Sequence, residues 1–276
     1  MGKLKAFALS VAAFAVLGSA NVQAADLPAL APPPIQDFGG WYLRGDIGMS
    51  NQRLKQLEHP LFLTATDFQW LDKGGFDSAP IFGIGIGYAH NSWFRWDLTG
   101  EYRGKSSFQA LDRFDNAGTP NTNDYDGMKS EWLFMLNAYI DFGTWKSFTP
   151  FIGAGIGASR ITISHFTDTN VIAGAGGFAE SASTWELAWA IHAGFAYQVT
   201  PNFIVELAYR YLSLGDGKTG DFRNTNPAAG CNVAPPCYPV VFKGLTSHDL
   251  KLGVRWMLAD MGVSHWRPSP AVTTRY

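Results

Sequence analysis

Residues 94–103 read FRWDLTGEYR, and this stretch decides the fold. Apolar and polar side chains alternate through it, with Phe94, Trp96, Leu98 and Tyr102 on one side and Arg95, Asp97, Thr99, Glu101 and Arg103 on the other. Successive side chains of a β-strand point to opposite faces, whereas a helix would distribute these residues around its circumference. The stretch therefore predicts a strand with one apolar face and one charged face.

Seven further segments alternate in the same way, so the chain is expected to form eight strands. These segments are residues 40–50, 81–89, 129–142, 148–159, 185–198, 203–212 and 249–258. Short connections at 91–92, 143–147 and 200–202 alternate with long segments at 51–79, 105–127, 160–183 and 215–244. About ten residues tilted by about 40° rise roughly 25 Å, the height of the apolar band of an outer-membrane barrel. We therefore predict an all-β fold, an eight-stranded antiparallel up-and-down transmembrane β-barrel with short periplasmic turns and long extracellular loops.

The composition excludes several other classes of protein. The chain has 276 residues, a net charge of −2, 16% charged and 14% aromatic residues, 30 glycines and a mean hydropathy of −0.04. A bundle of membrane helices would be more apolar, and a nucleic-acid-binding protein would normally be basic. The charged fraction lies below the roughly 25% of soluble globular domains. We expect no nucleic-acid partner.

The N-terminal region predicts export from the cytoplasm. Lys3 and Lys5 precede an apolar run that ends near Leu17, and Val22-Gln23-Ala24 resembles a cleavage site. The run is shorter than the roughly 20 residues that a membrane-spanning helix needs. We interpret residues 1–24 as a signal peptide, 25–37 as a Pro-rich periplasmic leader, 38–258 as the outer-membrane barrel and 259–276 as a periplasmic C-terminal extension.

Alternation alone does not decide which face of the sheet contacts lipid, because a soluble lipocalin-like barrel alternates as well. Three observations favour the membrane barrel: the export signal, the glycines of 83–87 and 153–157 on the polar face, and aromatic residues at both strand ends. The interior of an eight-stranded barrel has little room, so small residues there balance large charged ones. Aromatic residues at both ends of the strands are typical of the two membrane interfaces.

Four segments resemble a known family. GGWYLRGDIGMS (39–50), IFGIGIGYAH (81–90), PFIGAGIGAS (150–159) and SHDLKLGVRWML (247–258) are similar to the small eight-stranded outer-membrane surface proteins of alphaproteobacteria, of the OmpA/opacity-like barrel class. The resemblance covers about residues 38–258. It implies that the barrel-assembly machinery reads a signal in the last strand, here Gly253, Trp256 and Leu258, although the chain continues to Tyr276.

The polar face is expected to fill the barrel interior with ion pairs. The predicted network comprises Arg44, Asp46, Arg95, Asp97, Glu101, Arg103, Glu131, Glu206, Arg210, Lys251 and Arg255. Lys129, Asp141, Glu186 and Asp249 fall on the same face, which makes about seven cations against eight anions. Buried charges at this density must be paired. A near-neutral set favours a plugged interior over a narrow conducting channel, because a selective pore would carry one charge in excess.

The remaining motifs have less specific chemistry. Cys231 and Cys237 are the only cysteines, and we predict a disulfide between them because the compartment is oxidising. His59 and His165 fall in predicted loops and are candidate haem ligands, with solvated loop histidines as the alternative, and His192 is expected to join the interior hydrogen bonds. His248 and Asp249, with Glu131 and Glu186, could form a catalytic set at the rim, but no nucleophile motif supports an enzyme.

The function expected from the sequence is structural: a monomeric surface protein that supports envelope integrity and presents its loops for interaction. Loop aromatics could contact lipopolysaccharide or host and other cell-surface ligands, or they could pack the loops onto one another. Such aromatics are Phe62, Phe68, Trp70, Phe76, Phe108, Tyr125, Phe166 and Phe222. No cofactor is expected. The alternatives are a narrow porin for small solutes and a haem- or ligand-binding receptor.

Overall fold

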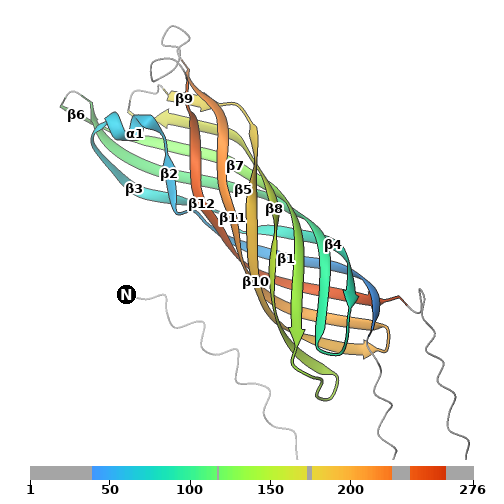
Figure 1. The fold of residues 1–276 in the computed structure, drawn as a ribbon. Coiled ribbons are helices and arrows are strands. Elements are labelled where there is room, and N and C mark those ends of the chain that lie inside the picture. Colours follow the sequence, from blue (N-terminus) through green and yellow to red (C-terminus); the bar gives the residue numbers. More distant parts are fainter. Residues whose placement is uncertain (1–38, 117, 173–175, 226–236, 259–276) are drawn as a thin grey trace, which may run out of the picture. The chain divides into compact units, whose positions relative to one another are not determined.

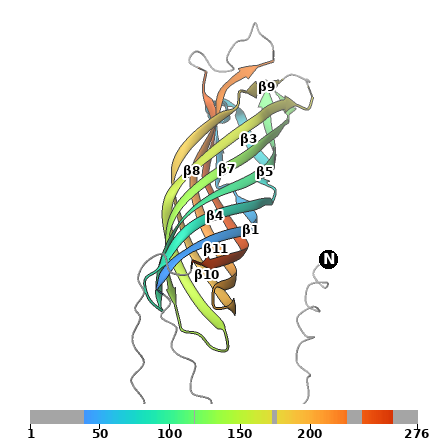
Figure 2. The same cartoon turned by 90° about the vertical axis from the view of Figure 1, so that its right-hand side faces the viewer.

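The computed structural model describes residues 39–116, 118–172, 176–225 and 237–258. Eight long antiparallel strands dominate it (Figures 1 and 2). They are β1 (Gly40–Arg53), β4 (Ala79–Ala89), β5 (Phe94–Asn116), β7 (Asn123–Asp141), β8 (Phe148–Asn170), β10 (Ala182–Thr200), β11 (Phe203–Asn224) and β12 (Pro239–Met257). The expected all-β, up-and-down arrangement of eight strands is confirmed.

Each long strand pairs with the next one along the chain, and the last pairs with the first. The pairing of β1 with β12 runs from Tyr42 opposite Met257 to Arg53 opposite Thr246. The eight strands therefore form a closed ring. Closure gives the backbone N–H and C=O groups of every long strand a partner on both sides, which an open sheet edge cannot do.

The elements outside the ring of eight strands gather at one end of the ring, and tight turns lie at the other (Figure 1). The elements at this end are β3 (Thr66–Phe76) and the shorter β2 (Gln56–Glu58), α1 (Pro60–Thr64), β6 (Thr119–Asn121) and β9 (Gly176–Ala179). The tight turn between β4 and β5 is fixed by Asn91, whose side-chain oxygen accepts from the backbone N–H groups of Trp93 and Phe94 at 3.0 and 2.7 Å. We call the end that carries these elements the far end, and the end with the tight turns the turn end.

The prediction of four long loops is wrong for much of their length. Most of 105–127 belongs to β5, β6 and β7, and β8, β11 and β12 continue into 160–170, 215–224 and 239–244. Segment 51–79 contains β2, α1 and β3. These segments are rich in Gly, Asn and Asp, which are depleted in strands, but cross-strand pairing outweighs that local preference.

The polarity of the ring inverts along the strands. In the turn half, which on β5 runs from Phe94 to Arg103, apolar side chains face outward and charged ones face inward. In the far half, from Lys105 to Asn116 on β5, the interior is an apolar core and the outer face is polar. The core residues include Phe76, Phe108, Tyr125, Ile161, Ile163, Phe166, Leu212, Phe222, Phe242 and Leu245.

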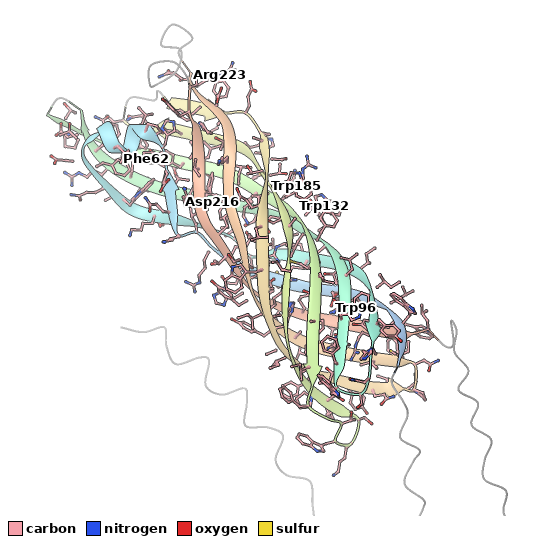
Figure 3. The ribbon with its side chains drawn as sticks, viewed as in Figure 1. Phe62, Trp96, Trp132, Trp185, Asp216 and Arg223 are labelled. Atoms are coloured by element: carbon pink, nitrogen blue, oxygen red, sulfur yellow. The ribbon has the colours of Figure 1, made fainter. Side chains whose placement is uncertain are left out.

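The outward side chains follow this inversion (Figure 3). Trp96, Trp132 and Trp185 project from the turn half, whereas Asp216 and Arg223 project from the far half. No helix among the described residues is long and apolar enough to cross a membrane. The predicted signal peptide (1–24), the leader up to residue 37 and the extension 259–276 lie outside the described residues and stay predictions, as does the disulfide, because Cys231 also lies outside them.

Candidate functional site

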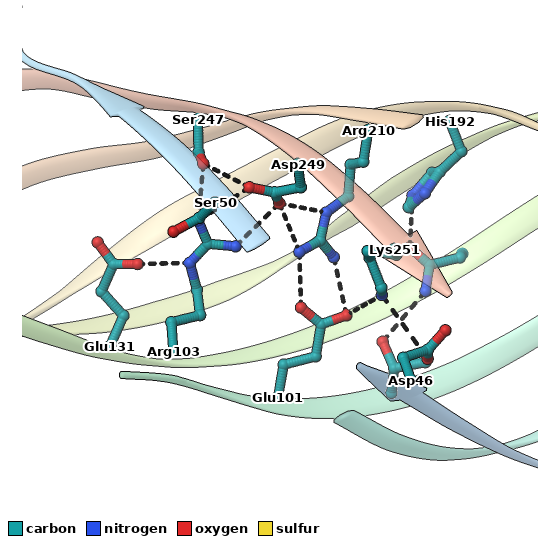
Figure 4. Close-up of polar contacts among 12 residues, drawn as sticks. Asp46, Ser50, Glu101, Arg103, Glu131, His192, Arg210, Ser247, Asp249 and Lys251 are labelled. Carbon is teal, nitrogen blue, oxygen red and sulfur yellow. Dashed lines mark hydrogen bonds and ion pairs between the residues drawn. The ribbon is translucent and has the colours of Figure 1, made fainter. Parts of the chain in front are cut away.

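The interior of the turn half holds a continuous chain of ion pairs, which begins at the level of Arg103 (Figure 4). Arg103 Nε donates to Glu131 Oε2 at 2.6 Å, and its Nη1 donates to Asp249 Oδ2 at 2.9 Å. Arg210 Nε reaches the same Asp249 oxygen at 2.9 Å. The other two nitrogens of Arg210 form a fork on Glu101 at 2.9 and 2.6 Å. A bidentate pair of this kind fixes orientation as well as charge.

The chain of pairs continues toward the turn end. Lys251 contacts Glu101 and lies 3.6 Å from Asp46 Oδ2, and Arg44 Nη2 donates to Asp46 Oδ1 at 2.8 Å. Arg44 also donates to Asp97 at 2.5 Å and lies 3.5 Å from Glu206.

Glu206 lies close to Arg95 and Arg255, the two cations nearest the turn end. Arg95 and Arg255 approach its Oε1 at 3.1 and 2.7 Å, although neither contact has the alignment of a hydrogen bond. Arg95 then reaches Asp141 at 3.2 Å. Its guanidinium also lies over the rings of Tyr139 and Phe151, at 4.0 and 4.8 Å from the centroids, where a cation is attracted to the aromatic face.

All eleven residues of the predicted network take part in these contacts, together with Asp141 and Asp249. Lys129 joins them through an ion pair with Glu131. Within the described residues, the interior pairs join seven cations (Arg44, Arg95, Arg103, Lys129, Arg210, Lys251, Arg255) to seven anions (Asp46, Asp97, Glu101, Glu131, Asp141, Glu206, Asp249). The formal charge of this set is therefore zero. Glu186 lies outside it, against Gly215 of β11.

Neutral groups complete the network, and most of them carried no charge signal in the sequence. The Tyr42 hydroxyl donates to Asp97 at 3.1 Å, and Asn137 Nδ2 donates to the other Asp97 oxygen at 2.9 Å. Arg44 donates to the Tyr139 hydroxyl at 3.1 Å. The expected inclusion of His192 is confirmed by its contact of 3.2 Å with Asn137 Oδ1.

Glycines on the inner face leave space for these large side chains. A Cβ on Gly87 would lie 2.2 Å from the Tyr42 ring, and one on Gly155 would lie 2.1 Å from Asn137 Oδ1. At Gly157 it would lie 1.9 Å from the backbone oxygen of Phe134. Real Cβ atoms do not approach other atoms this closely, so the glycine-rich repeats of β4 and β8 are needed for the interior to pack.

The middle of the interior is closed to water. Arg103, Asp97 and Asp249 are 0% exposed. One cavity of about 580 Å³ lies at the far end and another of about 170 Å³ at the turn end, and they share no lining residue. Between them stand the apolar side chains of Leu133, Met135 and Leu212 and the ion pairs.

The structure places the two candidate haem ligands in different surroundings, with His59 buried and His165 exposed. His59 begins α1, where its Nδ1 accepts from the N–H of Leu61 at 3.3 Å and its Nε2 contacts the carbonyl of Tyr238 at 3.3 Å. Both ring nitrogens are therefore occupied, and neither offers a lone pair to iron. Among the described residues no group of three or more His, Cys, Asp or Glu side chains is placed to hold a metal.

His248 and Asp249 of the candidate catalytic set do not come together, because neighbouring residues of a strand point to opposite faces. His248 faces outward, where its Nδ1 lies 2.6 Å from the Tyr209 hydroxyl, while Asp249 faces inward. The residues of the predicted assembly signal lie at the turn end of β12. Trp256 is exposed against Phe203, with ring centroids 5.8 Å apart, Gly253 leaves room for Asp46, and Leu258 N–H donates to Trp41 at 2.9 Å.

The comparisons with known proteins place the chain in a family. A model of the outer membrane protein beta-barrel domain matches residues 12–233. The chain belongs to this family. An uncharacterised protein of Brucella abortus is 31% identical over 224 residues, which cover 70% of this chain and 76% of the relative.

Two named relatives are more distant. The outer membrane protein PagN of Salmonella typhimurium is 30% identical over 139 residues, covering 48% of this chain and 56% of PagN. A putative adhesin of Rickettsia bellii is 28% identical over 184 residues, covering 66% and 76% of the two chains. Among solved structures, Neisserial surface protein A aligns with 79% of this chain and 97% of its own length, at 17% identity and a TM-score of 0.43. The protein is located in the cell outer membrane.

Proposed function

We propose that the turn half of the ring crosses the outer membrane as a β-barrel. The outward Trp132 of β7 and the outward Phe142, which directly follows this strand, stand ten residues apart. At about 3.3 Å per residue and a tilt of about 40°, this separation is roughly 25 Å along the membrane normal. Phe134, Leu136 and Ile140 between them are exposed on the outer face, as lipid-facing residues are. The polar outer face of the far half then stands in water.

We further propose that the protein is a structural surface protein whose interior ion pairs close the barrel. The observation that carries this proposal is the complete burial of Arg103, Asp97 and Asp249. Charged groups that line a water-filled pore stay hydrated, whereas these groups are 0% exposed and held by other side chains. A neutral interior set also lacks the excess charge of a selective channel. A narrow porin is the alternative function.

Planar-bilayer recording separates these two functions. Because the interior is filled, we expect the purified, refolded protein to give no stable conductance steps. The same protein, heat-denatured, is the control for leakage caused by detergent. Reproducible steps of uniform size, present only with the folded protein, would show that the interior conducts and would favour the porin.

The far half is the part that we propose for interaction with other surfaces. It stands beyond the apolar band and exposes charged side chains of both signs, among them Arg113, Asp124, Asp126, Lys218 and Arg223. A relative named as a putative adhesin supports a role in contact with host or other cell surfaces. Further proposed partners are lipopolysaccharide at the membrane interface and the barrel-assembly machinery, which would read β12. We propose a monomer without catalytic activity.

A further inference from the structure

The cavity of about 580 Å³ at the far end is separate from the interior ion pairs and differs from them in charge. Its walls come from segments that are distant in the sequence: α1 and its flanks, β5, β7, β8, β11 and β12. Among the described residues, its lining includes three aspartates and no lysine or arginine. None of them takes part in the interior ion pairs, so the proposed closure of the turn half does not use the cavity.

Aromatic rings form one side of this cavity. Phe62 stacks on Phe68 with centroids 5.2 Å apart and meets the edge of Tyr125 at 5.9 Å. Tyr125 stacks on Phe166 at 6.2 Å, and Phe166 meets Phe222 at 6.3 Å. The faces of such rings carry negative electrostatic potential and attract organic cations.

Two of the three carboxyl groups of the cavity accept hydrogen bonds, and one oxygen of the third does not. Asp115 Oδ1 accepts from the backbone N–H of Gly118 at 2.6 Å. Asp112 accepts from the Tyr125 hydroxyl at 2.6 Å and from the backbone N–H of Asn123 at 2.8 Å. Asp168 Oδ1 is buried, and no donor contacts it. A buried acceptor without a partner costs free energy that a ligand with an N–H donor would recover.

We infer that this cavity binds a protonated primary amine that carries an apolar group. The ammonium would donate to Asp168 Oδ1, as a charge-assisted hydrogen bond, and the apolar part would lie against Phe62, Phe166 and Phe222. A quaternary ammonium could use the rings but has no N–H for the carboxylate. The inference goes beyond the proposed function, because it needs neither a closed interior nor contact with lipid.

Amine binding in this cavity should depend on pH, because Asp168 titrates. Burial and the neighbouring Asp112 raise the pKa of Asp168 to about 7. The other titratable groups that face the cavity are Asp112 and Asp115 of β5, Tyr125 of β7 and His59, whose pKa is lowered by burial. As the pH falls through about 7, Asp168 gains a proton and loses the charge that holds the ammonium. Amine binding should therefore strengthen between pH 6 and pH 8.

Isothermal titration calorimetry on the full-length, detergent-folded protein tests this inference. The probes are 2-phenylethylamine, n-hexylamine and Nα-acetyl-lysine amide, with the neutral 2-phenylethanol as the matched control ligand. Asp168→Asn removes the charge and keeps the shape. Asp126→Asn is the matched control variant, because it replaces an aspartate by asparagine at an exposed position on the outer face of β7.

We expect the amines to bind and 2-phenylethanol to bind at least about tenfold more weakly, since a hydrogen bond to a charged group contributes about 1.5–3 kcal/mol, or about 10- to 150-fold. Asp168→Asn should weaken amine binding by a similar factor, while Asp126→Asn leaves it unchanged. Preference for the lysine derivative would indicate a lysine side chain as the natural source, and preference for the other two a free amine. Failure of all three amines to bind, or equal loss in both variants, would overturn the inference.

Discussion

Replacing Asp249 by alanine is expected to destabilise the folded protein by about 3–5 kcal/mol, the cost of removing one partner from a buried ion pair. Asp249 is 0% exposed and accepts from both Arg103 and Arg210. Without Asp249, the buried guanidinium groups of Arg103 and Arg210 lose the carboxylate that both of them contact. Equilibrium unfolding in urea of the protein refolded into vesicles, followed by tryptophan fluorescence, measures the change.

The matched control for Asp249→Ala is Glu58→Ala. Glu58 of β2 pairs with Lys243 at 3.8 Å, and both side chains are nearly half exposed. An exposed pair contributes at most about 1 kcal/mol, so Glu58→Ala should change the free energy of unfolding by no more than that. Equal effects of the two substitutions would mean that the interior of the turn half is hydrated and that its ion pairs do not close the ring.

Leu98→Arg is expected to destabilise the protein in a bilayer by about 2–4 kcal/mol, the cost of arginine on the lipid face of a barrel near the bilayer midplane. Leu98 is 55% exposed on the outer face of β5, between Ile86 of β4 and Leu136 of β7. If these side chains contact hydrocarbon, a guanidinium there must leave water. The same unfolding measurement in vesicles reports the cost.

Gln109→Arg provides the control on the same strand. Gln109 is also exposed on the outer face of β5, but in the far half, opposite Asp126. Since this face should lie in water, the substitution should change the free energy of unfolding by less than about 0.5 kcal/mol. A cost for Leu98→Arg as small as that of Gln109→Arg would indicate that the turn half does not lie in lipid.

The alternation of residues 94–103 was sufficient to predict the turn half, because strands with faces of opposite polarity leave a period of two in the sequence. The far half keeps this period, with Phe108 and Ala110 inward and Ser107 and Gln109 outward, but its polarity is inverted and turn-forming residues interrupt it. We therefore predicted loops where β5 and β7 continue.

Alternation also predicts which side chains face the interior but not which of them meet. Arg103 and Asp249 are 146 residues apart, and their contact depends on the register of several strand pairs. The cavity at the far end is even less predictable from the sequence. Phe62, Phe166 and Phe222 come from three segments that only the closed ring brings together, so no local pattern could identify it.

The lipid contact of the turn half can be measured most directly with nitroxide spin labels. Leu98→Cys and Gln109→Cys would be labelled singly, in a chain whose Cys231 and Cys237 are replaced by serine, and reconstituted into bilayers. We expect the label at 98 to be relaxed by dissolved oxygen and shielded from a water-soluble nickel complex, and the label at 109 to show the reverse. Nickel access at 98 equal to that at 109 would contradict the account, because the apolar outer face of the turn half would then lie in water.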